Sequence, residues 1–123
     1  IKFKAKRLDG KGWAIGDLLH SYENGAIIVP IEGGGAFSVD PSTICQFTGL
    51  KDKNGVEVWE HDLLTKDYSV IYEVGYEGCG FKASIKGEDE FDLNLVAVCK
   101  YDCICGNKFD RKEGEKNDEE KNI

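Results

Sequence analysis

The sequence predicts an all-β protein: a small SH3-like β-barrel core, an N-terminal β hairpin or arm as an additional layer, and a charged C-terminal tail. Three observations support this prediction. Short apolar segments recur at roughly 8–12-residue intervals, glycine-rich turns separate them, and no long helical periodicity interrupts them. We therefore divide the 123 residues into an arm at 1–38, a barrel core at 39–106 and a flexible tail at 107–123.

The first strands are predicted from the pattern at the N-terminus. Residues 1–5 alternate apolar side chains with lysines, which is the period of a half-buried strand. Asp9-Gly10-Lys11-Gly12 predicts a hairpin turn, with residues 13–19 as the partner strand. A β-branched run at 26–31 predicts a third strand that ends near Pro30, and the glycines at 33–35 predict a loop.

A hairpin around Asn54-Gly55 organises the middle of the chain. Asn-Gly between two short apolar segments predicts a type I′ turn, in which both central residues have φ > 0. The paired strands are predicted at 46–50 and 56–59, and a tight turn then leads into a strand at 62–66. This hairpin is the strongest local prediction of structure in the chain.

The later strands are predicted at 69–76 and 81–85, joined across a glycine-rich turn that places Phe81 opposite Tyr76. Residues 93–99 fit either a strand or a short helical turn packed on the barrel. Residues 102–106 are predicted to close the sheet. From residue 108 onward the chain is charged and lacks apolar periodicity, which predicts disorder or a frayed helix.

Charge is distributed unevenly along the chain. The net charge is −7, yet residues 1–11 carry +4 and residues 12–106 carry −10. A basic arm on an acidic body is compatible with self-association. It argues against nucleic acid lying over the main body, because phosphate neutralisation needs clustered Lys and Arg.

The sequence predicts neither a membrane segment nor a signal peptide. Its apolar runs are too short to cross a bilayer as a helix, and the N-terminus alternates instead of placing an apolar stretch after a charged end. Five cysteines without a regular framework favour reduced thiols. We therefore expect a cytoplasmic protein that does not bind membranes.

The central segment also carries a family resemblance. Residues 39–64 read V-D-P-S-T-I-C-Q-F-T-G-L-K-D-K-N-G-V-E-V-W-E-H-D-L-L. They resemble the signature of the YopX family of phage and prophage proteins, in which Q-(F/Y)-T-G-L-x-D-x-x-G leads into E-G-D-(I/L)-(V/L). The opening I-K-F-K-A, Trp13 followed by Gly16-Asp17-Leu18, and I-C-G-N at 104–107 resemble further parts of the family pattern.

The resemblance implies a phage or prophage origin, and its central motif defines a structural signature. In this chain the signature residues are Asp40, Gln46, Thr48, Gly49, Asn54, Gly55, Trp59, Glu60 and Asp62. The family usually has Gly at the position of His61, which implies a tight turn there. We therefore expect His61 at φ > 0 and Asp62 as an acceptor of backbone N–H groups.

Two clusters invite a chemical interpretation, and neither predicts a site. Glu60, His61 and Asp62 alternate sides if they lie in a strand, so they would not converge on one metal ion. Cys99, Cys103 and Cys105 have even separations and would share a face of one strand, but a structural zinc site needs four ligands and no nearby His supplies the fourth. Cys79 or Cys45 would have to complete it. Small buried thiols are the better interpretation, and we predict no metal and no cofactor.

We hypothesise a non-enzymatic phage accessory module that forms a homo-oligomer through β edges, with a host or phage protein as a further partner. We expect no enzyme, because no motif joins a nucleophile, a base and an oxyanion or metal site. One alternative is nucleic-acid binding through the basic arm; a second is an acidic decoy that occupies a host protein. The candidate contacts of the basic arm are Lys2, Lys4, Lys6, Arg7 and Lys11.

Overall fold

The computed structural model describes residues 1–21, 25–88 and 90–110, and the chain forms two compact units, Ile1–Phe47 (unit 1) and Thr48–Ile123 (unit 2). The division falls between Phe47 and Thr48, nine residues after the boundary that we placed at 38/39. The predicted tail begins at Asn107, which instead is the last, buried residue of a strand. Residues 111–123 of the predicted tail lie outside the described part of the chain.

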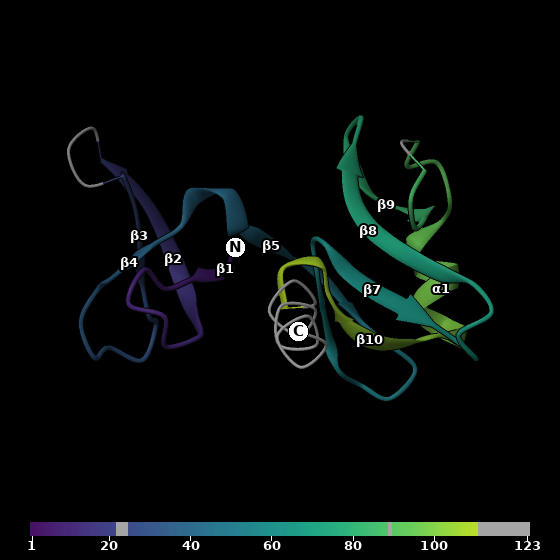
Figure 1. Cartoon of the computed structure of the whole chain (residues 1–123), viewed down its shortest axis with the longest axis horizontal. Coiled ribbons are helices and arrows are strands. Elements are labelled where there is room, and N and C mark those ends of the chain that lie inside the picture. Colours follow the sequence, from purple (N-terminus) through teal and green to yellow (C-terminus); the bar gives the residue numbers. More distant parts are fainter. Residues whose placement is uncertain (22–24, 89, 111–123) are drawn as a thin grey trace, which may run out of the picture. The chain divides into compact units, whose positions relative to one another are not determined.

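Unit 1 is an antiparallel sheet with the order β4-β3-β2-β1-β5 (Figure 1). Its strands β1 and β2 are the predicted N-terminal hairpin, and β3 is the predicted β-branched strand. Strand β5 continues into unit 2. The elements are β1 (Phe3–Lys6), β2 (Trp13–Ser21), β3 (Gly25–Val29), β4 (Phe37–Val39), the 3₁₀ turn η1 (Pro41–Thr43) and β5 (Cys45–Lys51).

The core of unit 1 consists mainly of small side chains. Ala5, Ala14 and Ala26 are buried beside Ile28 and Val39, because alternate residues of each strand point to the same side of the sheet. Strand β4, which the sequence did not predict, contributes Val39 to the core and pairs with β3.

Unit 2 contains a four-stranded antiparallel sheet with the order β10-β7-β8-β9 (Figure 1). The second half of β5 pairs with the short strand β6. All the strands predicted between residues 56 and 106 are confirmed within a few residues. The elements are β6 (Glu57–Trp59), β7 (Asp62–Thr65), β8 (Ile71–Glu77), β9 (Gly80–Ile85), α1 (Leu95–Tyr101) and β10 (Cys103–Asn107).

Residues 93–99, for which strand and helix were both open, contain the start of helix α1. Asn94 caps the helix, since its side chain accepts a hydrogen bond from the Ala97 N–H at 3.2 Å. Leu95 and Cys99, four residues apart, are buried against the sheet with Leu64 and Val74. The helix therefore covers one face of the four-stranded sheet (Figure 1).

The predicted SH3-like barrel is the main correction to the fold. The protein is mainly β, as predicted, but its two sheets do not form a closed barrel. After β9 the chain makes only a single bridge from Leu93 to Ala83 and then turns into α1. Closing a barrel would require a strand along β9, whereas the chain uses its next apolar residues to cover the sheet face.

The turn of the central hairpin also differs from the prediction. Gly55 has φ of 82°, but Asn54 does not have a positive φ, so the predicted type I′ turn is wrong. The Gly55 N–H donates to the Asp52 carbonyl at 3.0 Å, which is the bond of a type I turn, and the glycine follows it in the left-handed conformation. The Asp52 side chain, which accepts the Asn54 and Val56 N–H groups, favours this turn.

No helix in the described ranges is both long enough and apolar enough to cross a membrane.

Candidate functional site

The lysines of β1 form a row on one side of the unit 1 sheet. Phe3 and Ala5 pack in or against the core, so the residues between them point to the opposite side. The ammonium groups of Lys4 and Lys6 lie 4.6 and 4.9 Å from the centroid of the Trp13 ring. We call this surface the lysine face; it comprises Lys2, Lys4, Lys6, Trp13, Ile15, Leu19 and Phe47.

The remaining members of the lysine face add apolar surface. Lys2 lies over the Phe47 ring, 4.7 Å from its centroid. Ile15 is paired with Lys4 and is 47% exposed, while Leu19, on the same side of β2, is 55% exposed. Cationic and exposed apolar groups therefore share one surface.

Of the further predicted members of this basic cluster, the Arg7 side chain lies elsewhere and Lys11 belongs to the hairpin turn. The Arg7 guanidinium stacks on Phe37 at 4.1 Å and pairs with Asp9. Lys11 lies in the β1–β2 turn, where its backbone N–H donates to the Asp9 carboxylate at 3.0 Å. This bond, followed by the bond from Arg7, lowers the pKa of Asp9. Both basic residues thus contribute to the hairpin turn.

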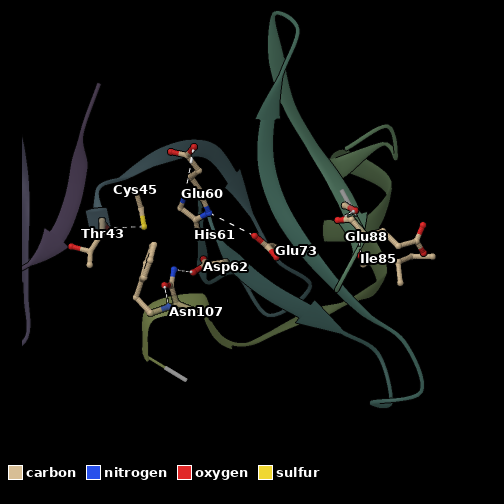
Figure 2. Close-up of polar contacts among 11 residues, drawn as sticks. Thr43, Cys45, Glu60, His61, Asp62, Glu73, Ile85, Glu88 and Asn107 are labelled. Carbon is tan, nitrogen blue, oxygen red and sulfur yellow. Dashed lines mark hydrogen bonds and ion pairs between the residues drawn. The ribbon is translucent and has the colours of Figure 1, made fainter. Parts of the chain in front are cut away.

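In unit 2, His61 lies at the tight turn between β6 and β7. Its φ is 70°, which confirms the predicted left-handed conformation. The imidazole lies between two carboxylates, with Nε2 3.8 Å from Glu60 and Nδ1 3.7 Å from Glu73 (Figure 2). Its ring also meets the Phe109 ring edge-on, with 5.3 Å between centroids. No sequence pattern indicates a role for Glu73, because Glu73 is 12 residues from His61 and comes close to it through the β7–β8 pairing.

Asp62 holds the same turn, as predicted. It is 2% exposed, and its carboxylate accepts a hydrogen bond from the Trp59 N–H at 2.8 Å. It also accepts one from the Asn107 amide at 2.9 Å (Figure 2). Asn107 in turn accepts a bond from the Phe109 N–H. The turn is therefore tied to the end of β10, and the structural role predicted for Asp62 is confirmed.

Asp52 is a structural centre that the sequence analysis missed. One carboxylate oxygen accepts the N–H groups of Asn54 and Val56, and the other accepts the Ile104 N–H at 2.9 Å. Burial opposes ionisation, but these bonds outweigh it and lower the pKa of Asp52. The turn bonds could have been expected from an Asp two residues before Asn54, whereas the bond to β10 could not.

The predicted signature residues shape turns and strand pairings. Asp40 caps η1, Thr48 donates its hydroxyl to the Val58 carbonyl at 2.7 Å, and the Asn54 amide donates to the Cys103 sulfur at 3.1 Å. Gln46 pairs with Phe3, and Gly49 and Gly55 have positive φ. Trp59 is buried, and Glu60 flanks His61. The contacts of the signature residues are therefore those of a motif that maintains the fold.

The cysteines do not have the arrangement that one extended strand would give them. Cys99 lies in α1, and a bulge in β10 interrupts the pairing around Cys105. Burial, followed by the nearby aspartates, raises the pKa of Cys99 to about 11, and burial also raises the pKa of Cys105. Throughout residues 1–21, 25–88 and 90–110 we find no group of three or more His, Cys, Asp or Glu residues that could hold a metal ion.

Comparison with known families gives one match. The model of the YopX protein family matches residues 15–115, which is most of the chain and includes both units in large part. No curated protein matches the sequence. The matched range contains the central signature, the glycine of β2 and the end of β10, and the chain belongs to the YopX protein family.

Proposed function

We propose that this protein is a non-enzymatic interaction module of phage or prophage origin that acts in the host cytoplasm and associates with further copies of itself. The observation that carries the proposal is the lysine face of unit 1. Protein interfaces typically combine an apolar centre with a charged rim. Membership of the YopX family supports the origin, and five free cysteines support a reducing compartment.

The apolar part of the lysine face provides the attraction. Ile15 and Leu19 are four residues apart on the same side of the strand that carries Trp13, with Asp17 between them. Covering a large aliphatic side chain contributes about 1.5–3 kcal/mol relative to leaving it in water. Because both side chains are about half exposed, covering them contributes roughly half of that figure each, which favours association but does not by itself offset its entropy cost.

The charges favour a second copy as the partner. Residues 1–11 carry +4 whereas residues 12–106 carry −10, so the basic strand of one copy and the acidic remainder of another attract each other. Such a contact joins two different surfaces. It therefore produces either a closed ring or an extended chain of copies.

The absence of catalysis is part of the proposal. Among the described residues, the side-chain contacts of His61 are two carboxylates and one aromatic ring. Acting as a base, His61 would therefore have no Ser, Thr or Cys nucleophile beside it to activate. The raised pKa of Cys99 keeps that thiol protonated near neutral pH. Both observations favour a structural role for His61 and Cys99 over a catalytic one.

Sedimentation of the full chain at micromolar concentration tests the proposal. We expect an oligomer that dissociates at high salt, and monomers for Leu19→Ser and Lys4→Glu. Lys100→Glu, which makes the same charge change on the exposed surface of α1, is the control and should associate like the wild type. A monomeric wild type would contradict self-association. Loss of association in Lys100→Glu equal to that in Lys4→Glu would show that the lysine face is not the interface.

Nucleic-acid binding by the same face is a second candidate. It is favoured by Lys4 and Lys6 of β1 and by Lys2 just before that strand, which lie beside two aromatic rings, since cationic and aromatic side chains together hold single strands. Fluorescence anisotropy with labelled single-stranded DNA and RNA should show binding that weakens with salt. Lys6→Glu should weaken it and Leu19→Ser should not. Absence of binding at low salt would exclude this candidate.

A further inference from the structure

An open groove lies on the four-stranded sheet of unit 2, on the side opposite α1. Leu64 and Val74 face the helix, so their neighbours Leu63 and Glu73, which are paired across β7 and β8, face the other side. The groove has two lobes of about 350 and 470 Å³, which share Leu63 and Lys86. Volumes of this size are typical of sites for small molecules.

The floor and one edge of the groove are apolar. Leu63 is 4% exposed and forms the floor with Ile71 of the next strand. Tyr68 stands at the edge and is 70% exposed, so its ring is available to a ligand. An apolar floor beside an exposed aromatic ring suits a flat ring system.

The cations that border the groove are Lys86 and Lys108. Neither ammonium group forms an ion pair within the described ranges of the chain. The charge of Lys86 lowers the pKa of Cys105 against the larger effect of burial, which places this charge close to the groove lining. The two acids that border the groove are Glu73 and Asp110. Glu73 lies against His61. The cations are therefore available to a negatively charged ligand.

Backbone strain is concentrated beside the same groove. In the part of the chain that the structure describes, the non-glycine residues with positive φ are His61 at 70° and Tyr68 at 66°. His61 contacts Glu73 of the groove, and Tyr68 belongs to its lining. The Tyr68 turn is fixed by Thr65, whose hydroxyl accepts the Tyr68 N–H at 2.9 Å and donates to the Val70 carbonyl at 2.6 Å. Strain held in place by such contacts often accompanies ligand sites.

We propose that this groove binds a small aromatic anion. The ring lies over Leu63 and Ile71 against Tyr68, and the anionic group meets the ammonium groups of Lys86 and Lys108. A mononucleotide and an aromatic carboxylate share this chemistry. The proposal concerns unit 2 and a small ligand, so it does not depend on association through the lysine face of unit 1.

Nuclear magnetic resonance titration of the ¹⁵N-labelled full chain tests the proposal. The probes are adenosine monophosphate and indole-3-acetate, with neutral adenosine and inorganic phosphate as partial ligands. We expect saturable shifts of the Gly87 and Gly106 amides, which line the two lobes, with at least one of the two aromatic anions. Binding of one anion alone identifies the source of the ligand. Adenosine and phosphate should each bind about tenfold more weakly or not at all, because each lacks one half of the recognised chemistry.

Matched lysine variants decide where the anion binds. Lys86→Gln and Lys108→Gln should each weaken binding about tenfold, the effect of one charge-assisted hydrogen bond. Lys82→Gln is the control, because Lys82 is exposed on β9 and does not border the groove. No saturable shift with either anion at millimolar concentration would overturn the proposal. So would unchanged binding by Lys86→Gln and Lys108→Gln, or an equal loss in the control.

Discussion

At the scale of single residues, two buried aspartates of unit 2 affect stability in opposite directions. Asp52 and Asp102 are 7% and 6% exposed. Three backbone N–H groups bond the carboxylate of Asp52, and its pKa is lowered. The Asp102 carboxylate accepts no hydrogen bond from the described residues, and burial raises its pKa although the charge of Lys66 opposes this shift. One charge therefore stabilises the fold and the other destabilises it.

Substitution by Asn should separate these two effects. Near pH 7, Asp52→Asn should lower the free energy of unfolding by about 2–3 kcal/mol, because the amide cannot accept every bond that the carboxylate accepts. The lowered pKa means that the contribution of Asp52 is present above the pKa of the unfolded chain and is lost as pH falls through the folded pKa. The difference between variant and wild type should therefore shrink in acid, as measured by urea unfolding at several pH values.

Asp102→Asn should have the opposite sign. Because the pKa of Asp102 is raised, its charge costs stability once pH exceeds the pKa of the unfolded chain, and the cost is complete above the folded pKa. We expect the variant to be more stable by up to about 1 kcal/mol near pH 7 and equal to the wild type in acid. A loss of stability at neutral pH would contradict this account of the buried charge.

The backbone at His61 gives a second test at this scale. At φ of 70°, a β-branched side chain is strained by about 1–2 kcal/mol and glycine is not. Urea unfolding should therefore show His61→Val to be less stable than His61→Gly. His20, which lies in the extended strand β2, is the control: there Val should be more stable than Gly. The same order at both positions would show that backbone conformation does not decide the effect.

At the scale of elements, close approach of the backbone explains a glycine of the family pattern. A Cβ at Gly16 of β2 would lie 2.2 Å from the Val29 carbonyl oxygen and 2.7 Å from the Pro30 Cα. Both are backbone atoms that pairing with β3 holds in place. No side chain fits between the two strands here, so glycine is required whatever its conformation.

Gly16→Ala should therefore be strongly destabilising. We expect a loss of about 2–3 kcal/mol in the free energy of unfolding, because the backbone of β3 must move to relieve the overlap. Gly80→Ala in β9 is the control, since a Cβ there meets nothing within 4 Å, and it should change stability by less than about 0.5 kcal/mol. Chemical denaturation followed by circular dichroism measures both. A Gly16→Ala variant as stable as the control would refute the close approach.

The strands and turns differ in how well their own residues predict them. The N-terminal hairpin and the strand pairs around residues 50–85 follow from alternation and turn residues, and the structure confirms them. Strand β4 has only three residues and no alternation of its own, so it forms because β3 is there to pair with it. The turn at Asn54 is decided by the Asp52 carboxylate, which favours a type I turn over the type I′ turn that Asn-Gly predicts.

At the scale of the whole molecule, the five cysteine thiols differ in how far the fold buries them. Cys79 is exposed in the turn between β8 and β9, whereas Cys99, on the buried side of α1, is 4% exposed. Only the thiolate reacts with alkylating reagents, so both exposure and pKa govern the rate. A thiol whose pKa is about 11 is protonated at neutral and mildly alkaline pH.

Alkylation with iodoacetamide near pH 8, followed by peptide mass spectrometry, should therefore modify Cys79 early. Cys99 should remain unmodified until urea unfolds the chain, and it should then react at the same rate as Cys79. Equal rates in the folded chain would mean that α1 does not protect the thiol.

The sequence by itself determined the mainly β class, nearly every strand and the structural use of Asp62, because alternation, turn residues and capping are local and depend on neighbours within a few positions. The tertiary structure decided everything that joins distant positions. It set an open sheet covered by a helix in place of a closed barrel, placed the Arg7 side chain on Phe37 away from the lysines of β1, and brought His61 to Glu73 and Asp52 to Ile104. These contacts depend on strand register, and register follows from how complete faces pack together rather than from any one segment.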